Sequence, residues 1–503
     1  MFIDARQLDD GTTIAADIAI IGAGAFGITL ARALRGSGRQ VVLIESGNLD
    51  FEGETQALYE GVTEGIDYNL DTARLRYFGG STNHWGGWCR PIEAHDFEQK
   101  DWVPHSGWPV GRADLDPWYP QAQEICELGA FDYGPDNLAR IGAPLGLPGG
   151  KIADGFFQYS PPTRFGERYR DDIADAQDVR CLLNANVTEI VAAHDAASIA
   201  RLDVATLTGK RFTVTATSYV LAAGGIENAR LLLASRSVAP AGLANQNDLV
   251  GRYFMEHPIF GPIASWICDA PELIAPYYGT YTALDGAVAR GCLFMTPEYM
   301  AREGRLNTIF TFTPNDAVRY LPGRPAEDGP IPLETEMLTL LRDVEPGAEH
   351  TGVRVYMGCG TEQAPNPDSR VTLADTVDAL GMPRTHLSWQ LTESDRESLI
   401  ANIATLAAAM GAWGHARLRR IVPADFAWSD VDMFWAHHHM GTTRMAADPK
   451  QGVVDANLKV HGIANLHIGG SSVWTTGCGA TNPTLSIVAF ALRLAERLRA
   501  GEA

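Results

Sequence analysis

The segment that decides the predicted fold is Asp17-Ile18-Ala19-Ile20-Ile21-Gly22-Ala23-Gly24-Ala25-Phe26-Gly27. Residues 17–21 indicate a fully buried strand, as expected in a parallel sheet that is covered on both faces. The glycines then predict a tight turn at Gly22, close approach of a phosphate at Gly24 and close helix–strand packing at Gly27. The N-terminus of the helix that follows would attract a pyrophosphate through its free N–H groups and its dipole.

A second predicted strand, from Gln40 to Ile44, ends on Glu45. Glu45 stands about 20 residues after the glycines, where its carboxylate would accept hydrogen bonds from ribose hydroxyl groups. This order of strand, turn, helix, strand and acidic residue predicts a site for an adenine dinucleotide rather than a glycine-rich loop without a ligand. It does not separate NAD from FAD, but an acidic residue at position 45 disfavours the 2′-phosphate of NADP.

Composition excludes several classes of protein. The chain has 503 residues and 46% hydrophobic content, enough for a large core and two or more domains. A formal net charge of −21 argues against nucleic acid or an anionic membrane as a partner. The seven cysteines form no C-x-x-C pair, which argues against a disulfide framework or a zinc site.

Location and assembly are also expectations from the sequence. The N-terminus lacks a basic region followed by an apolar stretch, and no apolar run approaches the roughly 20 residues that span a bilayer. We therefore expect a cytoplasmic protein without a membrane span. Assembly into a homo-oligomer is left open.

Further segments predict the rest of an α/β fold. Strands are expected at 182–191, 212–217 and 219–223, the last followed by a glycine turn and a helix, and a final short strand at 465–472. A proline- and acid-rich loop at 321–333 is either a lid or a solvated connector. We predict a Rossmann-type domain with a parallel sheet and an inserted α+β substrate domain with a mostly antiparallel sheet. The first domain is assigned residues 1–90, 180–256 and 441–503, and the second residues 91–179 and 257–440.

Three segments carry side chains or backbone suited to flavin chemistry. Residues 76–89 are rich in glycine and aromatic side chains, which suits either backbone laid against a flat ring or a tightly packed turn. The second segment is His438-His439-Met440-Gly441-Thr442-Thr443-Arg444-Met445, and the third is Thr481-Asn482-Pro483-Thr484-Leu485. A neutral imidazole suits a base that removes a hydroxyl proton near neutral pH, and an amide can hold the substrate oxygen.

Together these segments resemble the glucose-methanol-choline (GMC) oxidoreductases over nearly the whole chain. The details are most similar to the sugar-oxidising branch that includes pyranose 2-oxidase and the bacterial glycoside 3-oxidases. The resemblance implies FAD as the cofactor and oxidation of an alcohol to a carbonyl, with hydride passing to flavin N5 and oxygen or another acceptor taking the electrons. It rests on residues 17–45, 79–85, 106–109, 221–232, 251–258, 362–373, 438–445 and 482–485.

The resemblance also implies which residues hold the cofactor. Pro483 is expected at the first position of the last helix with Asn482 as its N-cap, so that the helix start stabilises negative charge on the reduced ring. In some pyranose 2-oxidases a histidine in the segment matching His84 is bonded to the flavin. Here Gly86 and Gly87 stand where those enzymes have Thr-Cys. This difference favours a His84 that lines the flavin site without a covalent bond to the ring, that is, a noncovalent wall. The predicted FAD contacts are Gly22, Gly24, Gly27, Glu45, Ser81, Asn83, His84, Val187, Ala223, Gly470, Pro483 and Thr484.

For catalysis the family pattern H-x-x-G-T assigns His438 as the base, with Asn482 as the residue that orients the alcohol. His439 is the alternative base, and a metal at the three histidines is disfavoured because consecutive residues project in different directions. Gln363 and His439 are expected to contact the substrate, although Gln363 also suits a strand edge. The predicted substrate is a sugar or glycoside with a secondary hydroxyl; the alternatives are a non-sugar alcohol and a flavin-binding subunit without turnover.

Overall fold

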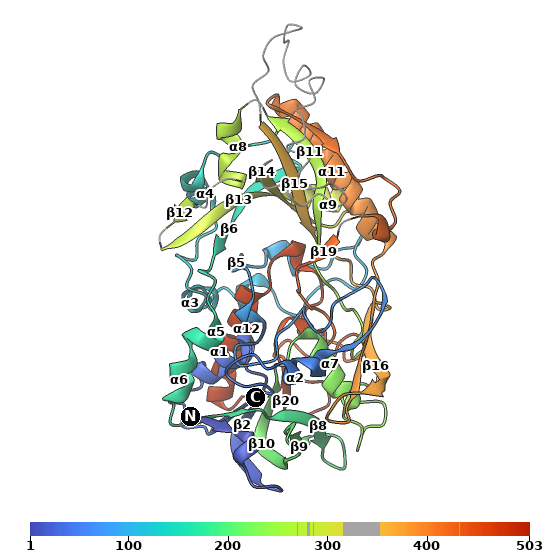
Figure 1. Cartoon of the computed structure of the whole chain (residues 1–503). Coiled ribbons are helices and arrows are strands. Elements are labelled where there is room, and N and C mark those ends of the chain that lie inside the picture. Colours follow the sequence, from blue (N-terminus) through green and yellow to red (C-terminus); the bar gives the residue numbers. More distant parts are fainter. Residues whose placement is uncertain (269, 279–281, 285, 315–352, 432, 503) are drawn as a thin grey trace.

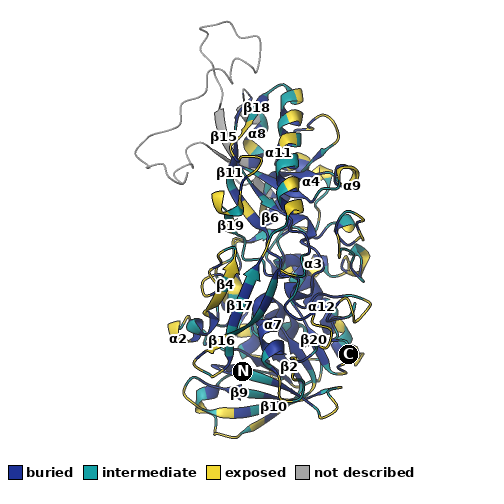
Figure 2. Ribbon diagram, turned by 90° about the vertical axis from the view of Figure 1, so that its right-hand side faces the viewer, coloured by how far each residue is buried: buried dark blue, intermediate teal, exposed yellow. Residues whose placement is uncertain are grey.

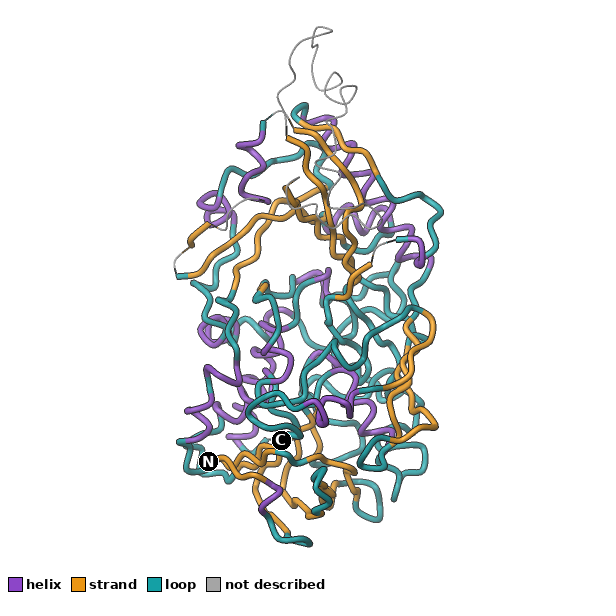
Figure 3. The backbone as a smooth tube through the Cα atoms, in the orientation of Figure 1, coloured by secondary structure: helices purple, strands orange, loops and turns teal. Residues whose placement is uncertain are grey.

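Two large sheets, one at each end of the molecule, give the chain an elongated shape (Figure 1). The computed structural model describes the whole chain except residues 269, 279–281, 285, 315–352, 432 and 503. The predicted lid or connector at 321–333 lies outside the described residues. Helices and loops fill the middle of the molecule, between the strands of the two ends (Figure 3).

The eight-stranded sheet contains the predicted dinucleotide fingerprint. Its central strands are parallel, and the hydrophobic side chains of Ile18, Ile20 and Ile21 are buried because helices and loops cover both faces. An antiparallel pair, β8 and β9, extends one edge. In spatial order the strands are β1 (Phe2–Asp4), β7 (Val179–Leu183), β3 (Val41–Ile44), β2 (Thr13–Ile21), β10 (Arg211–Leu221), β9 (Ile199–Ala205) and β8 (Asn186–Ala192), with β20 (Leu466–Ile468) also paired to β10.

Two strand predictions in this sheet are corrected by the structure. Residues 182–191 form two strands instead of one, because Asn184 takes a left-handed φ of 58° that ends β7 and turns the chain into β8. Residues 212–217 and 219–223 are predicted as separate strands, but residues 211–221 form the single strand β10, which pairs with β2 from Thr213 to Leu221.

Three helices position the ends of these strands. α1 (Ala25–Ala33) follows β2, α7 (Gly225–Ala234) follows β10, and α12 (Thr484–Ala500) packs against α1. Their apolar side chains join one hydrophobic core with the sheet. The N-terminus of each helix points to the same edge of the sheet, which is where ligands bind in open α/β folds.

The nine-stranded sheet forms the other end of the molecule, and its assigned strand pairs are antiparallel. Along β14 the side chains alternate: Phe310 and Phe312 pack toward the long helix α11 (Glu393–Trp413), whereas Ile309 and Thr311 face the middle of the molecule. In spatial order the strands are β18 (Ala416–Arg420), β11 (Pro258–Cys268), β15 (Val353–Thr361), β14 (Thr308–Pro314), β13 (Ala287–Met295), β6 (Ile152–Tyr159) and β5 (Trp88–Cys89), with β12 (Thr282–Leu284) beside β13 and β19 (Met433–Trp435) beside β11.

A three-stranded sheet runs along one side and has an exposed edge strand, β4 (Gly61–Gly65) (Figure 2). It joins β4 to β17 (Pro383–Trp389) and β16 (Arg370–Val377). The predicted domain limits place β4 in one domain and β16 and β17 in the other, yet they share this sheet. The other α-helices of the described residues are α2 (Gly53–Gln56), α3 (Tyr119–Ile125), α4 (Pro135–Ile141), α5 (Phe165–Arg168), α6 (Arg170–Ala174), α8 (Pro271–Tyr278) and α9 (Pro297–Glu303).

Candidate active site

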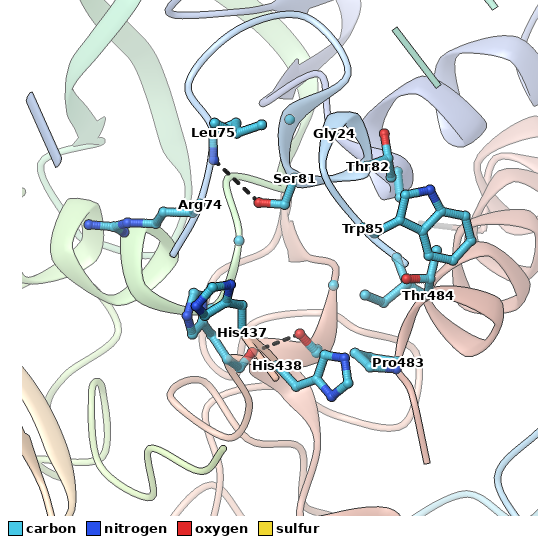
Figure 4. A pocket seen from close by; sticks show the side chains of 18 of the residues that line it. Gly24, Arg74, Leu75, Ser81, Thr82, Trp85, His437, His438, Pro483 and Thr484 are labelled. Atoms are coloured by element: carbon cyan, nitrogen blue, oxygen red, sulfur yellow. Dashed lines mark hydrogen bonds between the residues drawn. The ribbon is translucent and has the colours of Figure 1, made fainter. Parts of the chain in front are cut away.

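A cavity of about 560 Å³ extends from the first glycine turn to the inner face of the nine-stranded sheet. Its size lies in the range usual for small-molecule sites. The residues that line it come from many segments of the chain, the first at residue 21 and the last at residue 487. In Figure 4, His437, His438 and Pro483 lie on one side of the cavity, and Ser81 and Gly24 lie on the other.

The glycine turn leaves open space where a phosphate would bind. A Cβ on Gly22 would lie 2.6 Å from the Ala222 carbonyl oxygen, and one on Gly27 would lie 1.9 Å from that of Gly22, so both positions are restricted to glycine by packing. A Cβ on Gly24, in contrast, would meet nothing within 4 Å, because this residue faces the cavity. α1 starts at the next residue without a side-chain cap, which leaves its first N–H groups free for an anion.

Glu45 is buried in the cavity wall, as expected of a ribose-binding carboxylate. Its Oε2 accepts a hydrogen bond from the Ala23 amide at 3.0 Å, and its Oε1 accepts one from the Gly47 amide at 2.8 Å. A carboxylate has about four acceptor sites, so capacity remains for hydroxyl groups of a ligand.

At two further glycines that line the cavity, the backbone faces open space. Gly224 and Gly470 have φ values of 92° and 96°, and a Cβ on either would meet nothing within 4 Å. Val187, Ala223 and Thr484 also line the wall. This open glycine cradle, the uncapped N-terminus of α1 and the buried acid at position 45 fit FAD.

The glycine- and aromatic-rich segment contributes some of its predicted contacts and not others. Ser81 and His84 line the cavity, and burial lowers the pKa of His84 to about 4. Asn83 lies outside the lining, because its side-chain amide donates to the Phe78 carbonyl at 2.9 Å and closes the turn that begins at Gly79. Gly27 lies behind the wall, where it packs against Gly22.

His438 and Asn482 meet at the end of the cavity that lies under the antiparallel sheet. The Asn482 Nδ2 atom is 3.3 Å from Nε2 of His438. The prediction that Asn482 is the N-cap of the last helix is wrong. Pro483 occupies the cap position in a helical conformation, and α12 begins at Thr484. The amide of Asn482 is therefore free to face the imidazole instead of the helix backbone.

Two buried groups that sequence reasoning missed lie behind His438. Nδ1 of His257 is 2.9 Å from Nδ1 of His438, and the Oε1 atom of Glu256 accepts the His438 backbone N–H at 2.7 Å. Burial lowers the pKa of His438 well below its usual value and that of His257 to about 4, so both rings are neutral near pH 7. The only signal in the sequence was the segment 251–258, which supported the family resemblance without assigning roles.

Glu256 joins His438 to a second buried network. Burial raises the Glu256 pKa to about 7, although Tyr68 donates its hydroxyl proton to the carboxylate at 2.6 Å. The same hydroxyl oxygen lies 2.7 Å from Nε2 of His439, which also lines the cavity. The Nε2 atom of this imidazole is therefore already hydrogen-bonded to Tyr68.

Gln363, predicted to contact the substrate, lies behind the cavity wall. It is fully buried, and its Oε1 atom accepts hydrogen bonds from the Glu256 amide and the Trp389 indole N–H, both at 3.0 Å. It is outside the cavity lining. The side chains that the nine-stranded sheet contributes to the cavity wall are instead mostly apolar, and sequence reasoning did not select them: Trp88, Phe157, Ile259, Ile309 and Trp435.

Two features are absent from the described part of the chain. It holds no group of three or more His, Cys, Asp or Glu side chains placed to bind a metal ion. Nor does any helix in that part combine the length and apolar character needed to cross a membrane.

Comparison with known proteins places this geometry in a family. The family described as "FAD dependent oxidoreductase" matches residues 17–242, and "GMC oxidoreductase" matches residues 365–491. The large subunit of fructose dehydrogenase from Gluconobacter japonicus is 24% identical, over 97% of this chain and 98% of the relative. The 2-methyl-1,2-propanediol dehydrogenase of Mycolicibacterium austroafricanum is 26% identical, over 95% of this chain and 94% of the relative.

Solved structures agree on the fold. The crystal structure of pyridoxine 4-oxidase from Mesorbium loti superposes with a TM-score of 0.60 at 19% identity, covering 96% of this chain and 98% of the other. The cavity, the glycine cradle and these matches lead to one conclusion. The chain has a GMC oxidoreductase C-terminal domain and an FAD-dependent oxidoreductase domain, its relatives are GMC oxidoreductases, and it is an FAD-dependent oxidoreductase that acts on CH–OH groups.

Proposed function

We propose that this enzyme oxidises a secondary hydroxyl group of a sugar or glycoside to a carbonyl, with His438 as the base and Asn482 as the group that holds the alcohol oxygen. The observation that carries the proposal is the 3.3 Å contact between the Asn482 amide and Nε2 of a neutral imidazole, at the wall of the cavity that fits FAD.

The chemistry of these two side chains suits alcohol oxidation. Nε2 of His438 takes the hydroxyl proton, while the Asn482 amide donates a hydrogen bond to the same oxygen as negative charge develops on it. FAD, when bound, supplies the acceptor for the hydride that leaves the carbinol carbon. The alcohol thus loses a proton to the imidazole and a hydride to the cofactor, and a C=O bond forms.

The residues that would hold the cofactor follow from the cavity walls. Gly24 and the start of α1 would bind the pyrophosphate, and Glu45 would accept ribose hydroxyls. The backbone at Pro483 and Thr484, at the uncapped start of α12, would stabilise negative charge on the ring. His84 would form a noncovalent wall.

A sugar is favoured as substrate by Trp88 and Trp435, whose indole rings are flat surfaces in the same cavity as the proposed base. Similarity to a fructose dehydrogenase subunit supports the same substrate class. A second candidate, a non-sugar alcohol, is favoured by the aliphatic walls at Ile259 and Ile309 and by similarity to the 2-methyl-1,2-propanediol dehydrogenase.

Anaerobic bleaching of the flavin tests both parts of the proposal. His438→Ala should keep bound FAD but lose alcohol-dependent bleaching by about 10²-fold or more, the usual contribution of a general base. His386→Ala, on β17 and outside the cavity lining, is the matched control. Unchanged bleaching in His438→Ala would remove His438 from the base role.

The substrate class is tested with the wild-type enzyme and a panel of monosaccharides, glycosides and simple alcohols. Bleaching by simple alcohols alone would favour the second candidate. The cytoplasmic location stays a prediction, and assembly into a homo-oligomer stays open. The electron acceptor, oxygen or another compound, is tested by a screen of oxygen, a quinone and a ferricenium dye.

A further inference from the structure

A chain of three contacts ends on the atom of His438 that would take the substrate proton. The Gly477 carbonyl oxygen lies 2.6 Å from Nε2 of His257. Nδ1 of His257 lies 2.9 Å from Nδ1 of His438, and Nε2 of His438 lies 3.3 Å from the Asn482 amide nitrogen. Each imidazole uses both ring nitrogens in this chain.

Counting protons along these contacts leaves one arrangement. A carbonyl oxygen only accepts, so Nε2 of His257 must carry a proton and donate it to Gly477. A neutral imidazole has one N–H, so Nδ1 of His257 is a bare acceptor. Nδ1 of His438 must then carry the proton of the 2.9 Å contact, and its Nε2 is bare.

The parts that impose this arrangement are firmly held. His257 is buried, and one Glu256 oxygen, Oε1, accepts both the His257 amide at 2.8 Å and the His438 amide at 2.7 Å. This oxygen therefore ties together the backbones that carry the two rings. Gly477 packs tightly as well, since a Cβ there would lie 2.9 Å from the Glu362 side chain.

We propose that His257 is a positioning residue that selects the tautomer of His438, holding the proton on Nδ1 so that Nε2 is bare beside Asn482. Without an acceptor at this place the proton of His438 is free to move to Nε2, and an Nε2–H imidazole takes no proton from an alcohol at that nitrogen. The inference rests on the proposed role of His438 as the base.

Two substitutions separate tautomer selection from simple packing. His257→Leu fills the space without an acceptor, whereas His257→Asn keeps an acceptor oxygen bonded to Cγ, as Nδ1 is in histidine. We expect the limiting rate of anaerobic flavin reduction to fall at least about tenfold in His257→Leu, and by no more than the ~10²–10⁴ that a general base contributes. The alcohol concentration for half-maximal rate should change little, and His257→Asn should recover most of the rate.

His467 supplies the matched control, because it is a buried histidine on β20 outside the cavity lining, and its pKa is also lowered by burial to about 4. His467→Leu and His467→Asn should reduce their flavin at equal rates. If His257→Asn is as slow as His257→Leu, or if His257→Leu keeps the full rate, the proposal is overturned.

A spectroscopic readout does not depend on turnover. In holoenzyme labelled with ¹⁵N-histidine, assigned by comparison with His257→Asn and His438→Ala, the shifts should show Nδ1–H for His438 and Nε2–H for His257. A wild-type His438 with its proton on Nε2 would overturn the proposal even if the leucine variant failed to fold. Full flavin reduction in His438→Ala would instead remove the base role itself, and full reduction in His257→Leu alone would remove only the positioning role.

Discussion

The amide nitrogen of Asn482 lies 3.3 Å from Nε2 of His438, although the two residues are 44 positions apart in the chain. An amide does not titrate near neutral pH, so the Asn482 side chain stays uncharged at every pH at which the enzyme works. Any pH dependence that arises at this contact is therefore expected to report the imidazole and not the amide.

Titration of His438 should add no pH dependence to wild-type flavin reduction at and above neutral pH, because burial lowers the pKa of this ring well below its usual value. Asn482→Asp would place a negative charge beside the ring and raise that pKa. The reduction rate of this variant should then fall as the pH drops through the raised pKa. Stopped-flow bleaching as a function of pH measures it, and Asn482→Ala, slower but with the pH profile of wild type, is the control. A wild-type pH profile in Asn482→Asp would contradict the assignment.

Gly24→Val should weaken FAD binding on the order of tenfold or more, which corresponds to about 1.4 kcal/mol, because the new side chain would occupy the open space in front of α1. The fold should persist, since no protein atom lies within 4 Å of the added Cβ. The flavin-to-protein absorbance ratio after purification measures the loss. Gly53→Val, at an exposed glycine with equally open surroundings, should keep full flavin content.

Glu256 should make stability depend on pH. Its pKa is raised from 4.5 to about 7, so its contribution is complete below about pH 4.5 and is lost as the pH rises through about 7. The shift corresponds to a loss on the order of 3 kcal/mol across this window. Glu256→Gln cannot titrate, so the difference in Tm between wild type and this variant should be more favourable to wild type at about pH 5 than at about pH 8. A difference that does not change with pH would show that the carboxyl keeps one charge state throughout.

Acid precipitation should release the flavin into the supernatant, as expected if His84 forms a noncovalent wall. His84 faces the ring of His437 at a centroid distance of 6.1 Å, and two glycines follow it in the chain instead of the Thr-Cys of the covalent enzymes. His84→Ala should therefore still purify with FAD. A yellow pellet from wild type and a colourless one from His84→Ala would establish the covalent link instead.

The parts of the site that sequence predicted are those that local order encodes. The turn at Gly22, the open position at Gly24 and the acid at Glu45 follow one another in the chain, and their roles depend on backbone geometry that glycine and strand patterns reveal. The same holds for the strands β2 and β3. Such features can be predicted because neighbouring residues fix them.

The parts that were missed depend on contacts between distant segments. His257 acts on His438 across 181 positions, and Tyr68 meets Glu256 across 188 positions. Gln363 carries an amide that suits a sugar, but it turns away from the cavity because Trp389 and the Glu256 backbone satisfy it. No periodicity or spacing in the chain indicates which way such a side chain points.

The cavity needs both ends of the polypeptide, with consequences for how the enzyme matures. The phosphate turn is made early, at Gly22 to Gly27, but the wall opposite is closed by Asn482 and by the last helix, which packs on α1. A ribosome that has not yet translated residue 482 holds a chain without the amide beside His438 and without the last helix. Assembly of a functional holoenzyme is therefore a post-translational event, and a C-terminal truncation before residue 482 would yield a protein unable to oxidise its substrate.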